Sequence, residues 1–218
     1  MGNLLTRRRE LILAGESPLP EWDYVWSYSS GKYLSEDGWT KQITGTASEE
    51  FSGGYMYLLG KSDGHIDHTW PSTYNKGVMY VAFRQTTSSA TSRFFFGNGS
   101  TSIGVRPNYT SSQKKIFLND AASISNATPL TSFSYNKTWN LWLAFDNGVG
   151  QVWSRNYSDG GSFTKIAEDV DCSTIVGNDS GGIKINFYGS STTQQKLNLY
   201  FVRMQFGRVS SPADHGLV

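Results

Sequence analysis

The 218-residue chain has a formal net charge of +1, so it has no global field to hold nucleic acid or an anionic membrane, and a charged partner must meet a local patch. Aromatic residues make up 14 % and charged residues 17 % of the chain, with 23 glycines, which is typical of β-strands joined by glycine turns. The single cysteine, Cys172, excludes an intramolecular disulfide, and we expect it to be a small buried side chain.

The first 16 residues differ from the rest, because they alone combine helix-forming residues with an apolar recurrence of about 3.6 residues. Gly15, Pro18 and Pro20 end this pattern. Its apolar run is too short for a signal peptide, so we expect no export by the usual route. A short helix is marginal alone, so residues 1–20 dock on the following domain, form an ordinary frayed terminus, or form an arm attached to a larger assembly. The attachment residues would be Leu4, Leu5, Arg7, Arg8, Arg9, Leu11 and Ile12.

From Glu21 onward the chain alternates as β-strands do. Four aromatic residues at every second position predict an aromatic-faced first strand over residues 22–28, namely Trp22, Tyr24, Trp26 and Tyr28. Residues 78–85 are apolar on both faces, which predicts a central strand. Shorter strands are expected at 40–46, 51–59, 66–70, 93–97, 103–106 and 115–118.

A β-hairpin between Trp139 and Tyr157 is the strongest pattern of the chain. One face of its first arm carries Trp139, Leu141, Leu143 and Phe145. The sequence Asp146-Asn147-Gly148 tolerates the positive φ values of a tight reversal. Trp142 lies on the opposite face, so we expect this strand to be covered on both sides and central in the core.

Two strands at 183–188 and 196–206 close the chain, the last with Leu199 and Phe201 expected on one face against Asn198 and Tyr200. About a dozen strands with short turns indicate one all-β domain, a sandwich of two antiparallel sheets. We place this sandwich at residues 21–211 and a tail at 212–218.

The last third of the chain resembles concanavalin A-like (laminin G-like) jelly-roll domains. The likeness covers roughly residues 135–214 and rests on Trp139-Asn-Leu-Trp-Leu-Ala-Phe-Asp-Asn-Gly148, Ile183-Lys-Ile-Asn-Phe-Tyr-Gly189 and Leu199-Tyr-Phe-Val-Arg-Met-Gln-Phe-Gly-Arg-Val-Ser-Ser-Pro-Ala-Asp214. It implies a jelly-roll sandwich behind the N-terminal arm. The fold hosts both glycosidases and sugar-binding modules, so the fold alone does not choose between them.

A second resemblance concerns the arm. The segment Asn3-Leu-Leu-Thr-Arg-Arg-Arg-Glu-Leu11 is similar to the leaders of structural proteins of tailed bacteriophages. This likeness implies a virion component of a phage or prophage particle, in the head or in a tail fibre, assembled in the bacterial cytoplasm. Its partners would be other structural proteins, bound through the arm, and it would be oligomeric within the assembly.

Carboxylates are the first test of catalysis, because a retaining glucanase places two of them about 5 Å apart. Glu49 and Glu50 are adjacent, so a strand sends them to opposite faces. Glu168, Asp169 and Asp171 are expected in a solvated connection beside the cysteine. We therefore expect a non-catalytic protein. A glycan-degrading enzyme of the glucanase type and a secreted carbohydrate-binding module are the alternatives.

Metal binding has two sets of candidates. His65 and Asp67 share a strand face, which suits a transition metal, an acid–base pair or an ordinary hydrogen-bonded loop. A zinc site needs a further ligand, for which His215 is available. The laminin G-like resemblance implies calcium as the one possible cofactor, with Asp146, Asp159 or Asp179 as ligands.

Glycan binding needs exposed aromatic rings with polar neighbours. Because strand aromatics usually pack in a core, the candidates are the residues in or beside expected loops: Trp70, Tyr74, Asn75, Tyr109, Trp153, Tyr157 and Asp159, with Asn108 and Asn156 as further polar neighbours. Structural packing is the alternative for each ring. The resulting hypothesis is a virion-associated adhesion module that binds cell-surface glycan or protein through the sandwich. A purely architectural protein without a ligand is a third reading.

Overall fold

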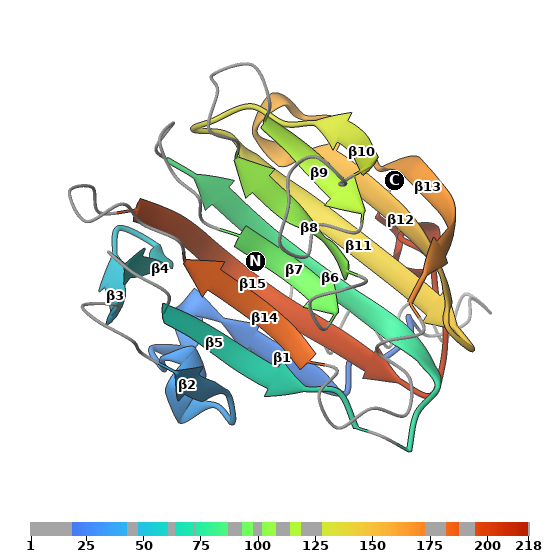
Figure 1. Ribbon diagram of the computed structural model, residues 1–218, viewed down its shortest axis with the longest axis horizontal. Helices are drawn as coiled ribbons and strands as arrows, with labels where there is room; N and C mark the ends of the chain where they lie inside the picture. The colour runs from blue at the N-terminus through green and yellow to red at the C-terminus, as the bar shows by residue number, and fades with distance from the viewer. Residues whose placement is uncertain are drawn as a thin grey trace, which may run out of the picture.

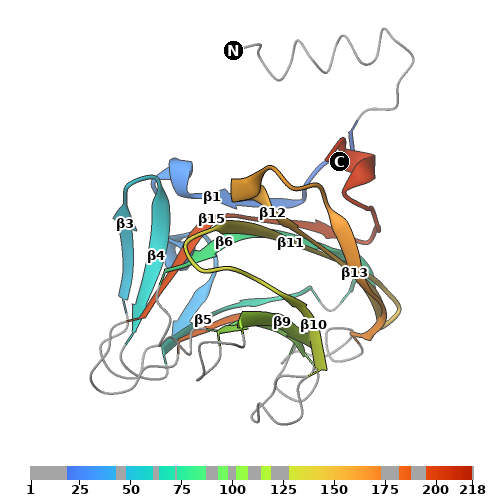
Figure 2. The same ribbon diagram turned by 90° about the horizontal axis from the view of Figure 1, so that it is seen from above.

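The computed structural model describes residues 19–42, 48–60, 64–71, 73–86, 93–97, 102–107, 114–118, 128–172, 182–187 and 195–217. These residues form two antiparallel sheets stacked face to face, one in front of the other in Figure 1 and seen edge-on in Figure 2. The predicted two-sheet sandwich is thus confirmed. The attachment residues predicted at positions 4–12 lie outside the described ranges.

Sheet A has the strand order β13-β12-β11-β6-β15-β4-β3, and β1 also pairs with β15. Its strands are β1 (Tyr24–Ser27), β3 (Ser48–Ser52), β4 (Tyr55–Gly60), β6 (Lys76–Gln85), β11 (Thr138–Asp146), β12 (Val149–Asn156), β13 (Thr164–Asp171) and β15 (Gln195–Phe206).

Sheet B has the order β10-β9-β8-β7-β14-β5-β2. Its strands are β2 (Thr40–Gln42), β5 (Gly64–Thr69), β7 (Arg93–Gly97), β8 (Ser102–Pro107), β9 (Lys114–Leu118), β10 (Thr128–Ser132) and β14 (Gly182–Phe187). Four short 3₁₀ segments also belong to the described chain: η1 (Tyr28–Ser30), η2 (Leu34–Glu36), η4 (Tyr157–Asp159) and η5 (Ala213–His215). Within the described ranges, no helix has the length and apolar character needed to cross a membrane.

The predicted hairpin is confirmed as β11 and β12, and β11 is central because it pairs with β12 on one side and β6 on the other. Asn147 and Gly148 make the turn with φ values of 49° and 84°. Leu141 and Leu143 point into the space between the sheets, whereas Trp142 is fully buried on the other face. The expectation that this strand is covered on both sides is therefore correct.

The main core fills the space between the sheets. From the inner face of sheet A, β6 and β11 contribute Met79, Val81, Phe83, Leu141, Leu143 and Phe145, each at most 1 % exposed. Burial of each such side chain contributes about 1.5–3 kcal/mol. Cys172 is a free thiol in the same core, as expected, and burial raises its pKa to about 12.

The aromatic first strand is shorter than predicted. Tyr24 and Trp26 of β1 pack against the main core, but Trp22 packs on the opposite face of sheet A and Tyr28 is exposed in η1. The strand predicted over 51–59 is divided in two, because Gly53 and Gly54, with φ of 56° and 94°, form a turn. Residues 51–52 end β3, and residues 55–59 lie in β4.

A β-bulge in β15 corrects the predicted last strand. Leu199 pairs with Phe83, and Phe201 pairs with the next residue of β6, Ala82, so Tyr200 is an extra residue. The bulge moves Phe201 from the face of Leu199 to the face of Asn198.

The acidic segment predicted as a connection is edge strand β13 instead. Its pairing with β12 is irregular, and Asp169 has a φ of 53°. Glu168, Asp169 and Asp171 are exposed there, as the edge position allows.

Candidate functional site

The outer face of sheet A, turned away from sheet B, is covered in part by the chain ends. Four residues of β6 and β11 are buried there: Val78, Tyr80, Trp142 and Ala144. Trp22 and residues 210–217 cover this part of the face, which we call the tail half; η5 lies on this side of the sheet in Figure 2. The Trp142 indole N–H donates to the Ser210 carbonyl at 3.0 Å, and the Trp22 ring stacks on His215 at 4.6 Å.

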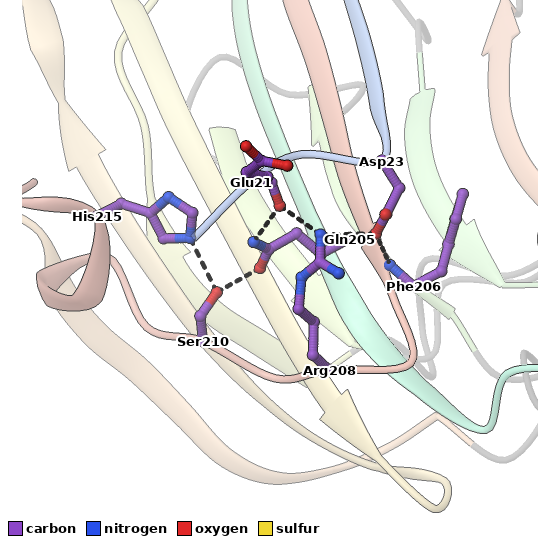
Figure 3. A network of polar contacts seen from close by, with 7 residues as sticks. All are labelled: Glu21, Asp23, Gln205, Phe206, Arg208, Ser210 and His215. Atoms are coloured by element: carbon purple, nitrogen blue, oxygen red, sulfur yellow. Dashed lines mark hydrogen bonds and ion pairs between the residues drawn. The ribbon is translucent and has the colours of Figure 1, made fainter. Parts of the chain in front are cut away.

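A polar network fastens the tail to the segment that precedes β1 (Figure 3). The Gln205 amide and the Arg208 guanidinium both donate to the Glu21 carbonyl, at 2.7 and 2.6 Å. Arg208 also forms an ion pair with Asp23 at 3.1 Å, and Asp23 accepts a hydrogen bond from the Phe206 N–H at 2.7 Å. These contacts join residues 21–23 to residues 205–208, which are far apart in the sequence, and they stabilise the fold.

Ser210 and His215 in this network resemble a catalytic pair, with Oγ 3.0 Å from Nε2. The Ser210 hydroxyl, however, donates to Gln205 Oε1, so His215 Nε2 must carry the proton of their contact and cannot accept one from Ser210. Asp214 accepts hydrogen bonds from the N–H and hydroxyl of Ser211, at 2.7 and 2.9 Å. Burial lowers the pKa of His215 to about 4, so its ring is neutral. The hydrogen bonds of Ser210 therefore hold residues 210–215 against β15.

Beside the tail half, polar residues occupy the same outer face. The strand register aligns Arg155, Asn140, Ala82 and Phe201 in one row across β12, β11, β6 and β15. Arg84 lies opposite Asn198 in the next row, and paired residues share a face. We call this region the arginine half and define it by Arg84, Asn140, Arg155, Asn198, Phe201 and Arg203.

Aromatic rings hold two of these arginines in place. The Arg155 guanidinium carbon lies 4.7 Å from the Phe163 ring centre and 5.2 Å from that of Tyr157. The guanidinium carbon of Arg203 lies 4.8 Å from the ring centre of Phe201. Such cation–π contacts fix a guanidinium without using its N–H donors.

The arginine half contains five buried polar atoms without a hydrogen-bond partner: Nε of Arg84, Arg155 and Arg203, and Oδ1 of Asn140 and Asn198. The rest of the described chain has two, His68 Nδ1 and Trp139 Nε1. Asn140 and Asn198 are only 2 % and 1 % exposed. Because folded proteins pair most buried polar groups, this concentration distinguishes the arginine half from the rest of the molecule.

Tyr80 links the two halves. Its hydroxyl accepts a hydrogen bond from the Asn140 amide at 2.6 Å, so one polar atom of that amide is bonded while the other is not. Burial raises the pKa of Tyr80, although the charges of Arg155 and Arg203 oppose the shift. The phenol therefore stays protonated and can act only as a hydrogen-bonding group.

A groove of about 470 Å³ adjoins this region along β15. It lies between η1 and the turn joining β3 to β4 and is lined by Tyr28, Gly31, Phe51, Gly53, Gly54 and Tyr55. The rings of Tyr28 and Tyr55 both meet the edge of Tyr200, at 6.4 and 6.0 Å. Because η1 and β4 both contact β15, the strand that carries Asn198 and Phe201, the groove lies beside the arginine half, on the side away from η4.

The structure separates the predicted glycan-binding residues into two groups. Trp70 is 1 % exposed, packed between Phe145 and Phe206, so it has no ring face for a ligand. Tyr74 is 40 % exposed and stacks on Phe206, and Asn75 bonds to Asn147. Tyr109, with Asn108, lies outside the described residues.

The second group borders the arginine half. Trp153 lies under the Lys165 ammonium at 5.3 Å, and Tyr157 is 60 % exposed beside Arg155. Asp159 pairs with Lys137 and accepts a hydrogen bond from the Asn156 amide at 2.7 Å, which stabilises η4. These three predicted residues therefore lie together, at the end of β12.

The described residues place the metal candidates only in part. His65 and Asp67 lie in β5, where they pair with Gln42 and Thr40 of β2. Among the residues that the structure describes, no cluster of three or more histidine, cysteine or acidic side chains could hold a metal ion. Asp146 and Asp159 are both exposed, the latter in its ion pair, and Asp179 lies outside the described ranges.

The residues of the arginine half lie in strands, whereas the sequence candidates lie in or beside expected loops. Arg84 and Asn140 lie in β6 and β11, whose apolar pattern predicts a central position, and Asn198 and Arg203 lie in the last strand, β15. The available signal was the interruption of that pattern: Asn140 stands inside Trp-Asn-Leu-Trp, where both faces of the strand are otherwise apolar. A polar residue in a strand covered on both faces needs an explanation.

No protein-family model matches the chain, and no curated protein sequence matches it. Several solved structures are similar to it. Domain 4 of AbnA, a GH43 extracellular arabinanase from Geobacillus stearothermophilus in complex with arabinotriose, has a TM-score of 0.59 at 12 % identity, over 89 % of this chain and 96 % of that one. Peanut lectin bound to a nine-residue peptide has a TM-score of 0.55 at 14 % identity, over 86 % and 98 %.

The exoplasmic/lumenal domain of VIP36 in its Ca²⁺- and mannose-bound form gives a TM-score of 0.52 at 9 % identity, over 80 % of this chain and 85 % of that one. Identities this low carry information about architecture. The chain has the lectin-type, concanavalin A-like jelly-roll fold, as the motifs at 135–214 predicted.

Proposed function

We propose that this protein is a non-catalytic glycan-binding module and that the arginine half of sheet A is its site. One observation carries the proposal: five of the seven buried polar atoms without a partner in the described chain lie there. These atoms are shielded from solvent, and their concentration marks the region as one not built for folding alone. A saccharide offers many hydroxyl groups that both donate and accept hydrogen bonds, which suits the guanidinium and amide groups gathered there.

Ring faces at both ends of the region suit the same ligand. Tyr157 is 60 % exposed at one end, and Tyr28 is 38 % exposed in the groove at the other. Sugar rings stack on such faces while polar side chains fix the hydroxyls. Two structural neighbours hold sugars, the AbnA domain arabinotriose and the VIP36 domain mannose, which supports the proposal.

The glucanase alternative requires two carboxylates about 5 Å apart. The charged side chains that define the arginine half are all arginines. Described carboxylates lie only at its margins: Glu50 is on β3, two strands beyond Asn198 in the same row, and Asp159 is on η4. This distribution favours binding over hydrolysis.

The test is affinity electrophoresis of the full chain through gels containing arabinan, xylan, mannan or polygalacturonate. At least one polymer should retard the protein. Tyr157→Ala should weaken that binding about five- to tenfold, because an aromatic contact is worth about 1–1.5 kcal/mol.

Tyr74→Ala is the matched control, since Tyr74 is an exposed tyrosine at the opposite end of the strands. It should bind as the wild type does. Equal losses in the two variants, or no retardation by any polymer, would exclude the arginine half as a glycan site.

The N-terminal arm supports a separate proposal, attachment to a phage or prophage particle. It rests on the likeness of residues 3–11 to phage leaders. A chain lacking residues 1–16 should stay folded but no longer co-purify with the particle. Unchanged co-purification would remove the arm as the anchor.

A further inference from the structure

We infer that the ligand of the arginine half is an anionic saccharide, whose sugar units carry carboxylate or sulfate groups. The inference rests on the proposed glycan-binding function and adds the charge of the ligand. It begins with Arg84, Arg155 and Arg203, which three different strands, β6, β12 and β15, place on one face.

The charges of these arginines are unbalanced within the described chain. None of the three forms an ion pair with a described carboxylate. The ion pairs beside the region, on its η4 and β13 side, join other residues: Lys137 with Asp159, and Lys165 with Glu168. The centre of the region is therefore cationic, with its acidic groups at the margins. A ligand bound across it gains by supplying negative charge.

The guanidinium groups also have the geometry that an anionic ligand requires. Phe163 and Tyr157 hold Arg155, and Phe201 holds Arg203, through ring contacts. The Nε–H of each arginine has no partner, although Arg155 also forms a hydrogen bond with the Tyr80 hydroxyl. A guanidinium has five donors in a planar fork, and a carboxylate or a sulfate accepts two of them in parallel. These ring contacts position Arg155 and Arg203 without a ligand, which favours affinity.

Arg208 shows how the same protein treats a structural arginine. It pairs with Asp23 at 3.1 Å and donates to the Glu21 carbonyl at 2.6 Å, so both its charge and its donors are used. Arg155 and Arg203 have ring contacts in place of a carboxylate, and each leaves a buried Nε unpartnered. The contrast makes Arg208 a control of the same residue type.

The experiment measures binding of the full chain to polygalacturonate, dextran sulfate, neutral dextran and the neutral polymers above, at low and high salt. At least one anionic polymer should bind tenfold or more tightly than every neutral one, and the tighter of the two identifies carboxylate or sulfate as the group. Added salt should weaken this binding. Arg155→Gln and Arg203→Gln should each weaken it about tenfold or more.

Two further variants separate charge from folding. Arg208→Gln removes an arginine that is already paired and should bind as the wild type does. Arg155→Lys keeps the charge but loses the planar fork, so it should fall between the wild type and Arg155→Gln. Far-ultraviolet circular dichroism of each variant confirms that the sheets are intact.

The inference and the proposed function fail in different ways. Equal binding of neutral and anionic polymers, or wild-type binding by Arg155→Gln, overturns the inference and leaves glycan binding through Tyr157 in place. Equally tight binding of double-stranded DNA overturns it too, because the site would then recognise any polyanion. Absence of binding to every polysaccharide overturns both.

Discussion

The inner and outer faces of sheet A both bury aromatic rings, but they differ in whether their buried polar groups have hydrogen-bond partners. On the inner face, residues such as Leu143 and Phe145 pack in an apolar core. On the outer face, the tail half satisfies its polar groups through the C-terminal network, whereas the arginine half leaves five buried atoms unpartnered. Unpartnered buried atoms cost stability. A central strand can therefore be covered on both faces while one face stabilises the fold and the other keeps polar groups available for binding.

The largest expected effect compares one phenylalanine from each face. Phe145→Ala should lower the free energy of unfolding by about 3–5 kcal/mol, because the side chain is 1 % exposed and leaves a cavity in the main core. Phe201→Ala should lower it by about 1–2 kcal/mol, since this ring is only partly buried. Chemical denaturation measures both. Equal losses would mean that the outer face is a second structural core.

A second prediction concerns pH and the tail half. Burial lowers the pKa of His215 to about 4, Asp214 opposes this shift, and the charges of Arg203 and Arg208 add to it. In the unfolded chain the pKa is about 6.5. Between these values the unfolded state binds a proton that the folded state does not, so stability is full above pH 6.5 and falls as the pH drops toward 4. We expect a loss of roughly 2 kcal/mol over this window.

The variant His215→Phe isolates that contribution. Phenylalanine keeps the ring that stacks on Trp22, and Ser210 keeps its hydrogen bond to Gln205. Denaturation at a series of pH values should show that the gap between wild type and variant narrows as the pH falls from 6.5 to 4. A constant gap would show that His215 does not titrate in this window and that other groups cause the acid sensitivity.

Much of the fold follows from local patterns in the sequence. The hairpin of β11 and β12 was predictable because the alternation of Leu141 and Leu143 and the turn at Asn147-Gly148 are properties of neighbouring residues. The central place of β6 followed from its two apolar faces. The last strand was misread at Phe201, because a bulge at Tyr200 shifts the alternation by one residue and depends on pairing with a distant strand.

The candidate site was predicted only at its rim. Trp153, Tyr157 and Asp159 border the site because they lie near the end of β12 or in η4. Residues in or beside such a connection are the ones that the sequence pattern favours for binding. Its centre combines Arg84 with Asn198, which are more than a hundred residues apart and are brought together by strand pairing alone. No local pattern predicts which strands pair, so the meeting of Arg84 and Asn198 could not be predicted. The only signal in the sequence is the polar residues that interrupt the apolar pattern of the strands.

The smallest expected effect on stability tests the comparison most directly. Asn198 is 1 % exposed and its Oδ1 has no partner, so Asn198→Leu removes a buried polar group without breaking a bond to that atom. The free energy of unfolding should stay the same or rise by about 1 kcal/mol. Binding to the polysaccharide found above should weaken about tenfold, because an apolar side chain then lies opposite Arg84 within the site.

Gln205→Leu is the control on the same strand and face. Gln205 is fully buried, but its amide donates to the Glu21 carbonyl and accepts from Ser210. Its loss therefore breaks two hydrogen bonds and leaves the buried Ser210 hydroxyl without its acceptor, whereas the Glu21 carbonyl keeps Arg208. It should cost about 2–3 kcal/mol and leave binding unchanged. Opposite behaviour of the two variants, one affecting binding and the other stability, would assign separate roles to the two halves. If Asn198→Leu instead destabilised the protein as Gln205→Leu does, Asn198 would be part of the structural network, and the outer face would have no region kept apart from folding.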